Sequence, residues 1–191
     1  MSGPRRLRVA VPKALDFRET MEARILSSLA GPEADRLTTN KGFRFQIACH
    51  EASHVLAGYS LGLRVVQATT HAERYSDGSW SSGSVSFSEG AARKPGGEVR
   101  HASPGDVMGA IIAISWIAPA GQWSWRYGRR ELRRYRQQAD EFVNRYWAEI
   151  QALAVELLWT RTLGEEELAA ILGRMRLEKI NEFQNKTIAP A

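Results

Sequence analysis

Two histidines one helical turn apart, with a glutamate between them, have the spacing that points most clearly to chemistry. They are His50, Glu51 and His54, in the stretch "IACHEASHVLAGYSLG". On an α-helix, residues i and i+4 share one face, so both imidazoles could bind one Zn²⁺ through nitrogen. Glu51 would lie beside that face. There it could act as general base on a metal-bound water whose pKa the metal lowers to about 7. The pattern predicts a metal centre with its own base.

These residues require a helix, and the sequence predicts one from residue 43 to a C-cap at Gly62. An amphipathic helix is predicted before it, from residue 17 to Gly31-Pro32, because apolar side chains recur there at every fourth position. Residues 1–16 contain two prolines and are expected to form an irregular arm.

Two strands are expected after the histidine helix. Residues 63–72 are rich in β-branched side chains and favour a strand. The short alternating run at 83–87 indicates a second strand, at a sheet edge. A loop of about 15 residues should follow it, in a segment rich in glycine and serine.

The rest of the chain should be helical. We expect an apolar helix at 105–124, a long amphipathic helix at 128–161, and a last helix at 163–175 opened by a Thr162–Glu165 capping box. The predicted fold class is therefore α+β, mostly α-helical, with a small β-sheet and a C-terminal helical bundle.

Composition narrows the class of protein. The 191 residues are 43% apolar and 25% charged, which fits one globular domain with an arm. The single cysteine, Cys49, excludes an intrachain disulfide and favours a reducing, cytoplasmic location.

The longest apolar stretch, at 107–120, has 14 residues where a membrane span needs about 20, so no span is expected. The net charge of +5 comes without a nucleic-acid-binding motif. We therefore expect a solvated arginine-rich face and no nucleic-acid partner.

The histidine stretch resembles the zinc-binding helix of the FtsH-type ATP-dependent zinc metalloproteases, whose motif reads H-E-A-G-H. Ser53 stands where that family has glycine. The order of elements is also similar over roughly residues 42–175. The resemblance implies a zincin-like peptidase domain at 42–175, with an N-terminal arm and helix at 1–41 and a tail at 176–191.

That family takes its third metal ligand from an aspartate that opens a later helix, in a pattern like G-x-x-x-D-[IL]-x-x-A. The best match is "YGRRELRRYRQQADEFV", which implies Glu131 as the third Zn²⁺ ligand. A salt bridge from Glu131 to Arg134 is the alternative. Asp140 and Glu141 are poorer candidates for the ligand, and Asp106 is weaker still.

The resemblance also assigns a substrate site. In such proteases an extended peptide lies along an edge strand and is held by main-chain hydrogen bonds. The residues implied here are Gly83, Ser84, Val85, Ser86 and Phe87, although an ordinary edge strand fits them equally well. His71 and His101 are not expected to bind the metal, and Cys49 is expected to be a small buried residue.

The expected function is that of a hydrolase, a zinc metalloendopeptidase. There is no G-x-x-x-x-G-K-[ST] phosphate loop and therefore no ATPase of its own. Its polypeptide substrate would have to be flexible or delivered by a separate unfoldase or adaptor, and a homo-oligomer is left open. The alternative is a catalytically inactive binding or regulatory module. It is motivated by glutamate in place of aspartate at Glu131, by the nearby arginines, and by Gln122-Trp123 where the family carries an acidic residue.

Overall fold

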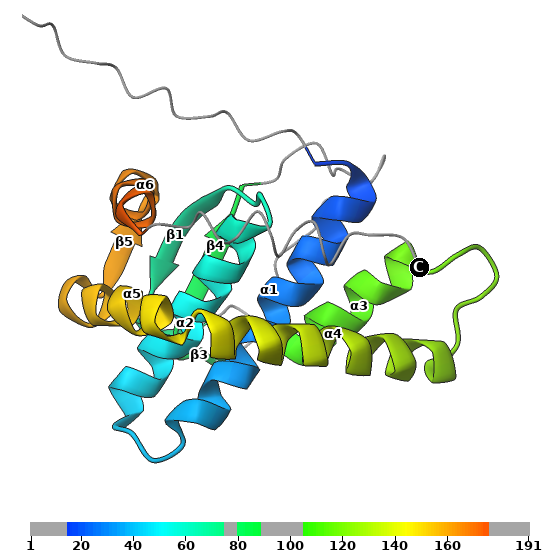
Figure 1. Cartoon of the computed structure of the whole chain (residues 1–191), viewed down its shortest axis with the longest axis horizontal. Coiled ribbons are helices and arrows are strands. Elements are labelled where there is room, and N and C mark those ends of the chain that lie inside the picture. The colour runs from blue at the N-terminus through cyan, green and yellow to red at the C-terminus, as the bar shows by residue number, and fades with distance from the viewer. Residues whose placement is uncertain (1–14, 75–79, 89–104, 176–191) are drawn as a thin grey trace, which may run out of the picture.

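Helices make up most of the structure, with one small antiparallel sheet beside them (Figure 1). The computed structural model describes residues 15–74, 80–88 and 105–175. In these ranges the mostly helical α+β class is confirmed. The helices are α1 (Phe17–Thr38), α2 (Phe43–Ser60), α3 (Asp106–Ile117), α4 (Trp125–Arg145), α5 (Trp147–Thr160) and α6 (Glu165–Arg174).

The sheet has β1 (Val65–Thr69) at its centre, paired antiparallel on one side with β4 (Ser84–Phe87) and on the other with β5 (Thr162–Gly164). β4 is therefore an edge strand in the described part of the chain, as the alternating run predicts. β5 was not predicted from the sequence. A separate two-stranded ribbon joins β2 (Glu73–Arg74) to β3 (Trp80–Ser81).

Helix α1 begins as its sequence predicts and ends later. Asp16 caps its first turn by accepting a hydrogen bond from the Glu19 backbone N–H at 2.8 Å. The predicted end at Gly31-Pro32 is wrong, because the helix continues through the proline to Thr38. A proline inside a helix costs about 3 kcal/mol. Buried residues beyond it, Ala34 and Thr38 among them, pack against the rest of the molecule and offset that cost.

Three other boundaries differ from the sequence-based predictions. Helix α3 ends at Ile117 because Ala118 precedes a proline, which forces extended backbone there. The long helix expected at 128–161 is two helices, α4 and α5, separated at Tyr146. The last helix is capped two residues later than predicted, at Gly164. The Glu167 carboxylate accepts from the Gly164 N–H at 2.9 Å, while Thr162 pairs with β1.

Two groups of buried side chains form the core, and α1 and α2 lie side by side between them (Figure 1). One group joins the buried side of α2 to the sheet, α5 and α6, and includes Leu56, Leu153 and Leu157. The other joins α1 to α3 and α4, and includes Ile25, Leu29 and Ile114. Helix α1 is therefore built into the body of the molecule and forms part of the wall against which α2 packs.

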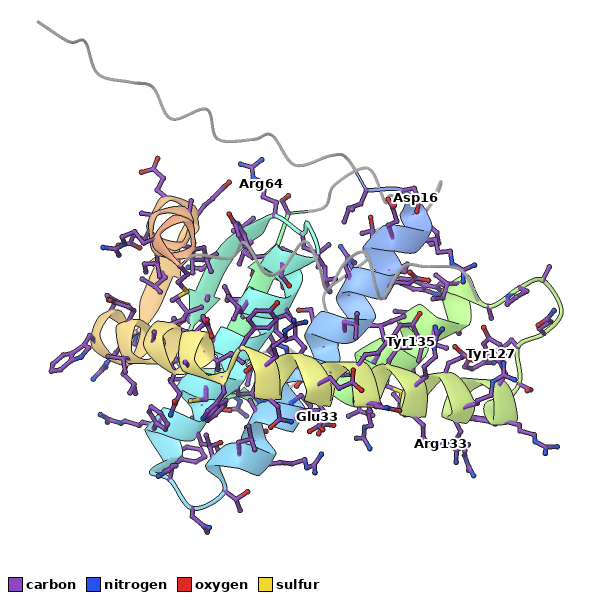
Figure 2. The ribbon with its side chains drawn as sticks, viewed as in Figure 1. Asp16, Glu33, Arg64, Tyr127, Arg133 and Tyr135 are labelled. Atoms are coloured by element: carbon purple, nitrogen blue, oxygen red, sulfur yellow. The ribbon has the colours of Figure 1, made fainter. Side chains whose placement is uncertain are left out.

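Helix α4 separates a buried side from a basic outer side. The side chains of Tyr135 and Arg133 leave it in opposite directions (Figure 2), and Tyr135 is 2% exposed. Arg126, Arg129, Arg130 and Arg133 are all exposed on the outer side, in line with the expected arginine-rich face. Among the described residues, no helix has the length and apolar character needed to cross a membrane.

Candidate metal centre

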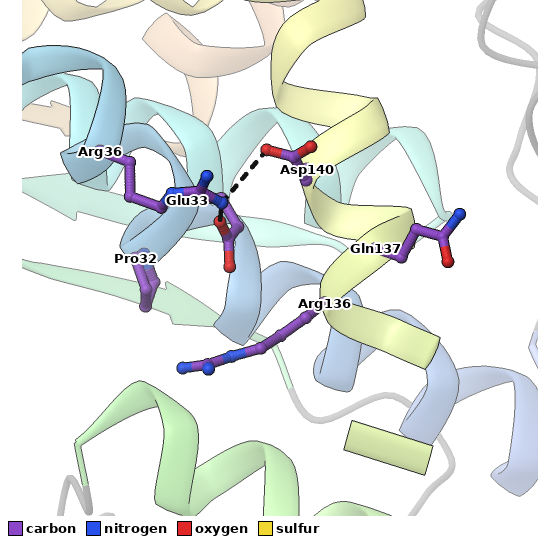
Figure 3. A pocket seen from close by; sticks show the side chains of 6 residues that line it. All are labelled: Pro32, Glu33, Arg36, Arg136, Gln137 and Asp140. Carbon is purple, nitrogen blue, oxygen red and sulfur yellow. Dashed lines mark hydrogen bonds and ion pairs between the residues drawn. The ribbon is translucent and has the colours of Figure 1, made fainter. Parts of the chain in front are cut away.

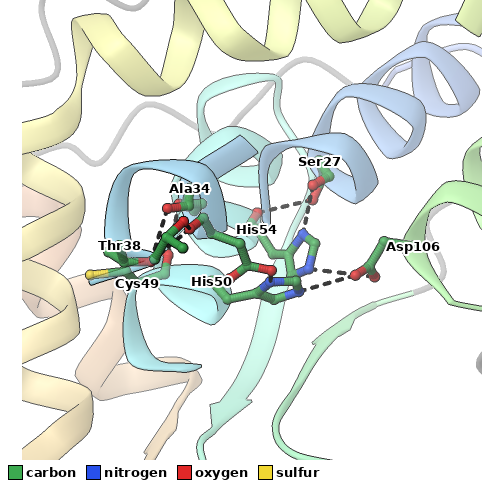
Figure 4. A network of polar contacts seen from close by, with 10 residues as sticks. Ser27, Ala34, Thr38, Cys49, His50, His54 and Asp106 are labelled. Carbon is green, nitrogen blue, oxygen red and sulfur yellow. Dashed lines mark hydrogen bonds and ion pairs between the residues drawn. The ribbon is translucent and has the colours of Figure 1, made fainter. Parts of the chain in front are cut away.

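Three side chains from two helices converge and could hold a metal ion (Figure 4). His50 and His54 lie one turn apart on α2, and Asp106 is the first residue of α3. His50 Nε2 lies 3.0 Å from one carboxylate oxygen of Asp106, and His54 Nε2 lies 3.5 Å from the other. Candidate ligand atoms of all three residues lie within 4.8 Å of one another.

Two contacts within this group have lengths close to those expected in a tetrahedral site. With metal–ligand bonds of 2.0–2.1 Å, two ligand atoms of a tetrahedral Zn²⁺ site are about 3.3 Å apart. The two Asp106 contacts, at 3.0 and 3.5 Å, bracket that value. Three protein ligands would leave a fourth position open, as catalytic zinc sites do.

Helix α1 orients both histidines by contacting their Nδ1 atoms. His54 donates from Nδ1 to the backbone carbonyl of Ser27 at 2.6 Å, and this fixes its tautomer because a carbonyl can only accept. Asp35 Oδ2 lies 2.9 Å from His50 Nδ1. An ionised carboxylate also accepts only, so His50 donates there. In both rings Nε2 is the nitrogen that faces Asp106.

The site attracts positive charge. Burial would lower the pKa of His50, but its hydrogen bonds to Asp106 and Asp35 and the charge of Glu51 raise that pKa to about 10. Burial would in turn raise the pKa of Asp106, yet the two histidines hold it well below its usual range. In the metal-free protein, a proton on His50 balances part of the negative charge of these carboxylates. A divalent cation bound to Nε2 could take the place of that proton.

Glu51 lies at the same site but is not part of the candidate ligand group. It is 5% exposed, and burial raises the pKa of its carboxyl, with the histidine charges acting in the opposite direction. Its carboxylate lies against Gly83, where an added Cβ would come within 2.5 Å of Oε1. Glycine at position 83 therefore makes room for this carboxylate.

The edge strand lies alongside the histidine helix. Gly83, just before β4, contacts Glu51 on α2, and Phe87, at the end of β4, lies over Gly58 two turns farther along α2. Of the predicted substrate-binding residues 83–87, Gly83 is therefore brought to the candidate site, whereas Phe87 lies two turns away along α2. Val85 and Phe87 are half-buried, and Ser86 is exposed.

The structure does not bring Glu131, predicted as the third ligand, to the histidines. Its carboxylate pairs with Arg130 and Arg134 on its own helix, each at 3.1 Å. The carboxylate that lies on the histidines belongs to Asp106, the weakest of the candidates weighed from sequence. A signal was present, because "DVMGA" matches the D-[IL]-x-x-A part of the family pattern except for valine at its second position.

The other candidates for the third ligand have partners elsewhere. Asp140 pairs with Arg36 at 3.5 Å, and Glu141 accepts from Gln137 at 3.1 Å. His71 is exposed after β1 and is outside the ligand group. His101 and the loop expected after residue 88 lie outside the described residues. Cys49 is fully buried, as expected, and burial raises its pKa to about 12.

A separate cavity of about 570 Å³ opens between α1 and α4 (Figure 3). Arg36 lies in it, paired with Glu33 at 2.6 Å and with Asp140. The two acidic and two basic side chains of its lining balance in charge, and Asp140 is the one candidate ligand from the sequence analysis that lines it. The full lining is Pro32, Glu33, Arg36, Arg136, Gln137 and Asp140.

Comparison of the chain with protein families, with curated proteins and with solved structures found no match. The geometry of the site and the motif in the sequence therefore carry the functional inference.

Proposed function

We propose that this protein is a zinc-dependent metallopeptidase with a zincin-like domain. The observation that carries the proposal is the convergence of Asp106 on the Nε2 atoms of His50 and His54, with Glu51 buried beside them. Two nitrogens and one carboxylate oxygen form a donor set typical of catalytic zinc sites. The resemblance of the histidine stretch to FtsH-type proteases supports the same activity.

Each residue has a defined role in this proposal. His50, His54 and Asp106 hold the ion, which would supply a more acidic water and polarise the scissile carbonyl. Glu51 would serve as the base that takes a proton from the attacking water and as the acid that returns it to the leaving amine. The raised pKa of Glu51 suits both steps, because it brings the carboxyl closer to the pH at which the protein would work.

The substrate would be an extended polypeptide added to the edge of β4 that pairs with no strand among the described residues. Main-chain hydrogen bonds along an edge strand hold a peptide without selecting its sequence. The edge begins at Gly83, next to Glu51, so a peptide on it would pass the general base. Such binding requires a substrate that is already unfolded, or one that a separate unfoldase or adaptor supplies.

Replacing Glu51 with glutamine tests the proposal. Glu51→Gln keeps the size of the side chain and removes the base, so it should retain Zn²⁺ and lose cleavage of an unfolded protein such as casein. General-base catalysis accounts for about 10²–10⁴-fold in rate. The matched control is Glu156→Gln on the exposed side of α5, which should cleave normally. Full activity in Glu51→Gln would refute the mechanism. Tight zinc binding by a wild-type chain without cleavage would instead favour a binding or regulatory module.

A further inference from the structure

One face of α1 carries three residues, four positions apart, that all contact the histidines. Ser27, Gly31 and Asp35 lie one above the other because i, i+4 and i+8 share a helix face. Ser27 lies at His54, Gly31 lies against both rings, and Asp35 lies at His50. This row precedes the segment at 42–175 that the sequence assigns to the peptidase domain.

Ser27 binds the α2 backbone as well as a ring. Its hydroxyl donates to the carbonyl of His54 at 2.9 Å, and its own carbonyl accepts from His54 Nδ1 at 2.6 Å. Ser27 is 2% exposed, so neither bond competes with bulk water. The two helices are therefore locked in register at His54.

Gly31 lets the rings approach the helix. A Cβ at this position would come within 2.6 Å of His50 Nε2 and of the Nε2 and Cε1 atoms of His54. Any other residue would push into the nitrogens that face Asp106. This close approach explains a glycine in the middle of a helix, where it costs about 1 kcal/mol relative to alanine.

Asp35 gives the two histidines unequal partners. His54 donates to a neutral carbonyl, whereas His50 donates to a carboxylate, which makes its Nε2 a stronger donor to a metal. The Asp35 contact is on the ring nitrogen opposite the one that faces Asp106. Asp35 therefore contacts the candidate ligand group through His50.

We propose, resting on the metal centre of the proposed function, that Asp35 is a positioning residue. Asp35 accepts the Nδ1–H of His50 and thereby directs Nε2 to the metal. Together, Ser27, Gly31 and Asp35 form the side of the site that α1 contributes. An outer carboxylate of this kind contributes about 10–100-fold to metal affinity.

The test measures zinc affinity of the full chain by competition with a chromophoric chelator. Asp35→Ala should weaken Zn²⁺ binding about 10–100-fold. Asp35→Asn, which can still accept a hydrogen bond, should fall between it and the wild type, and Asp35→Glu should recover part of the loss. Asp140→Ala is the matched control, because Asp140 is similarly exposed (44% against 37%) but lies in the separate cavity. It should bind zinc as the wild type does.

A second readout separates positioning from general stability. In the zinc-loaded wild type, the Nδ1–H protons of His50 and His54 should both be visible by NMR and slow to exchange. Asp35→Ala should lose the protection of His50 alone, because Ser27 still holds His54. Zinc affinity of Asp35→Ala within about twofold of wild type, or His50 bound to the metal through Nδ1, would overturn the inference. So would a wild-type chain that binds no zinc.

Neither readout uses peptide cleavage, so the two proposals can fail separately. A chain that shows this affinity pattern without Glu51-dependent cleavage would refute the peptidase and leave the role of Asp35 standing. A chain that cleaves peptides but binds zinc equally well with and without Asp35 would refute the role of Asp35 and leave the peptidase proposal standing.

Discussion

Asp106 and Glu131 are carboxylates on two helices that both pack against α1, yet they have opposite surroundings. The Asp106 carboxylate lies on two imidazoles, and its partners among the described residues are those rings. Glu131 lies between two guanidinium groups on its own helix and is neutralised by them. The proton on His50 can leave when a metal binds, whereas the arginines beside Glu131 stay charged, so Glu131 gains little by exchanging partners.

The difference shows that helix position alone does not identify a ligand. Both residues lie in the first two turns of their helices. The composition of the neighbouring turns decides between them. Asp106 is followed by Val107, Met108 and Gly109, whereas Glu131 is surrounded by arginine in the sequence itself.

Removing each carboxylate in turn should produce the largest contrast. Asp106→Ala deletes a ligand and should lower zinc affinity by more than about 100-fold, beyond the effect of an outer partner. Glu131→Ala should bind zinc as the wild type does. Chelator competition on both variants measures the contrast. An equal loss of zinc affinity in both variants, or a loss confined to Glu131→Ala, would contradict the assignment of Asp106 as the third ligand.

The glycine under the rings gives the next largest effect. Gly31→Ala should destabilise the protein by about 1–3 kcal/mol through overpacking, and should weaken zinc binding because the methyl group displaces both imidazoles. Thermal and urea unfolding measure the first effect.

Gly173→Ala on α6 is the control for this prediction. An added Cβ there meets nothing within 4 Å. It should stabilise the chain by about 0.4–1 kcal/mol, because it restricts the unfolded state without a clash. A Gly31→Ala protein as stable as Gly173→Ala would mean that the rings do not lie against α1.

Breaking one of the two arginine pairs of Glu131 should have the smallest effect. Arg134→Ala removes a pair whose arginine is 52% exposed, and such pairs contribute at most about 1 kcal/mol. We expect unchanged zinc affinity and a small shift in the urea midpoint. An increase in zinc affinity on removing Arg134 would indicate that Glu131 reaches the metal once it is released.

The sequence predicted those parts of the site that depend on local spacing. His50, Glu51 and His54 could be placed on one helix because helical geometry relates residues one to four positions apart. Asp106 lies 56 residues beyond His50, and no local rule brings them together. Asp35 was missed for a related reason. Its helix was expected to end at Gly31-Pro32, and only packing against α2 shows that the helix continues past the proline.

The sheet shows the same limit. β1 and β4 were predicted from side-chain patterns, whereas β5 is three residues long and exists because it pairs with β1 across nearly a hundred residues of chain. The break between α4 and α5 at Tyr146 has no glycine or proline near it, so the sequence gives no signal for it. Such features follow from tertiary contacts, which override weak local preferences.

The central claim is that His50, His54 and Asp106 together bind one metal ion. Anomalous diffraction from a crystal of the zinc-loaded protein, recorded at the zinc edge, tests it most directly. We predict one strong peak, with the Nε2 atoms of both histidines and an Asp106 oxygen about 2.0–2.2 Å from it. A peak that lies elsewhere, or a zinc ion bound by Glu131 in place of Asp106, would contradict the claim.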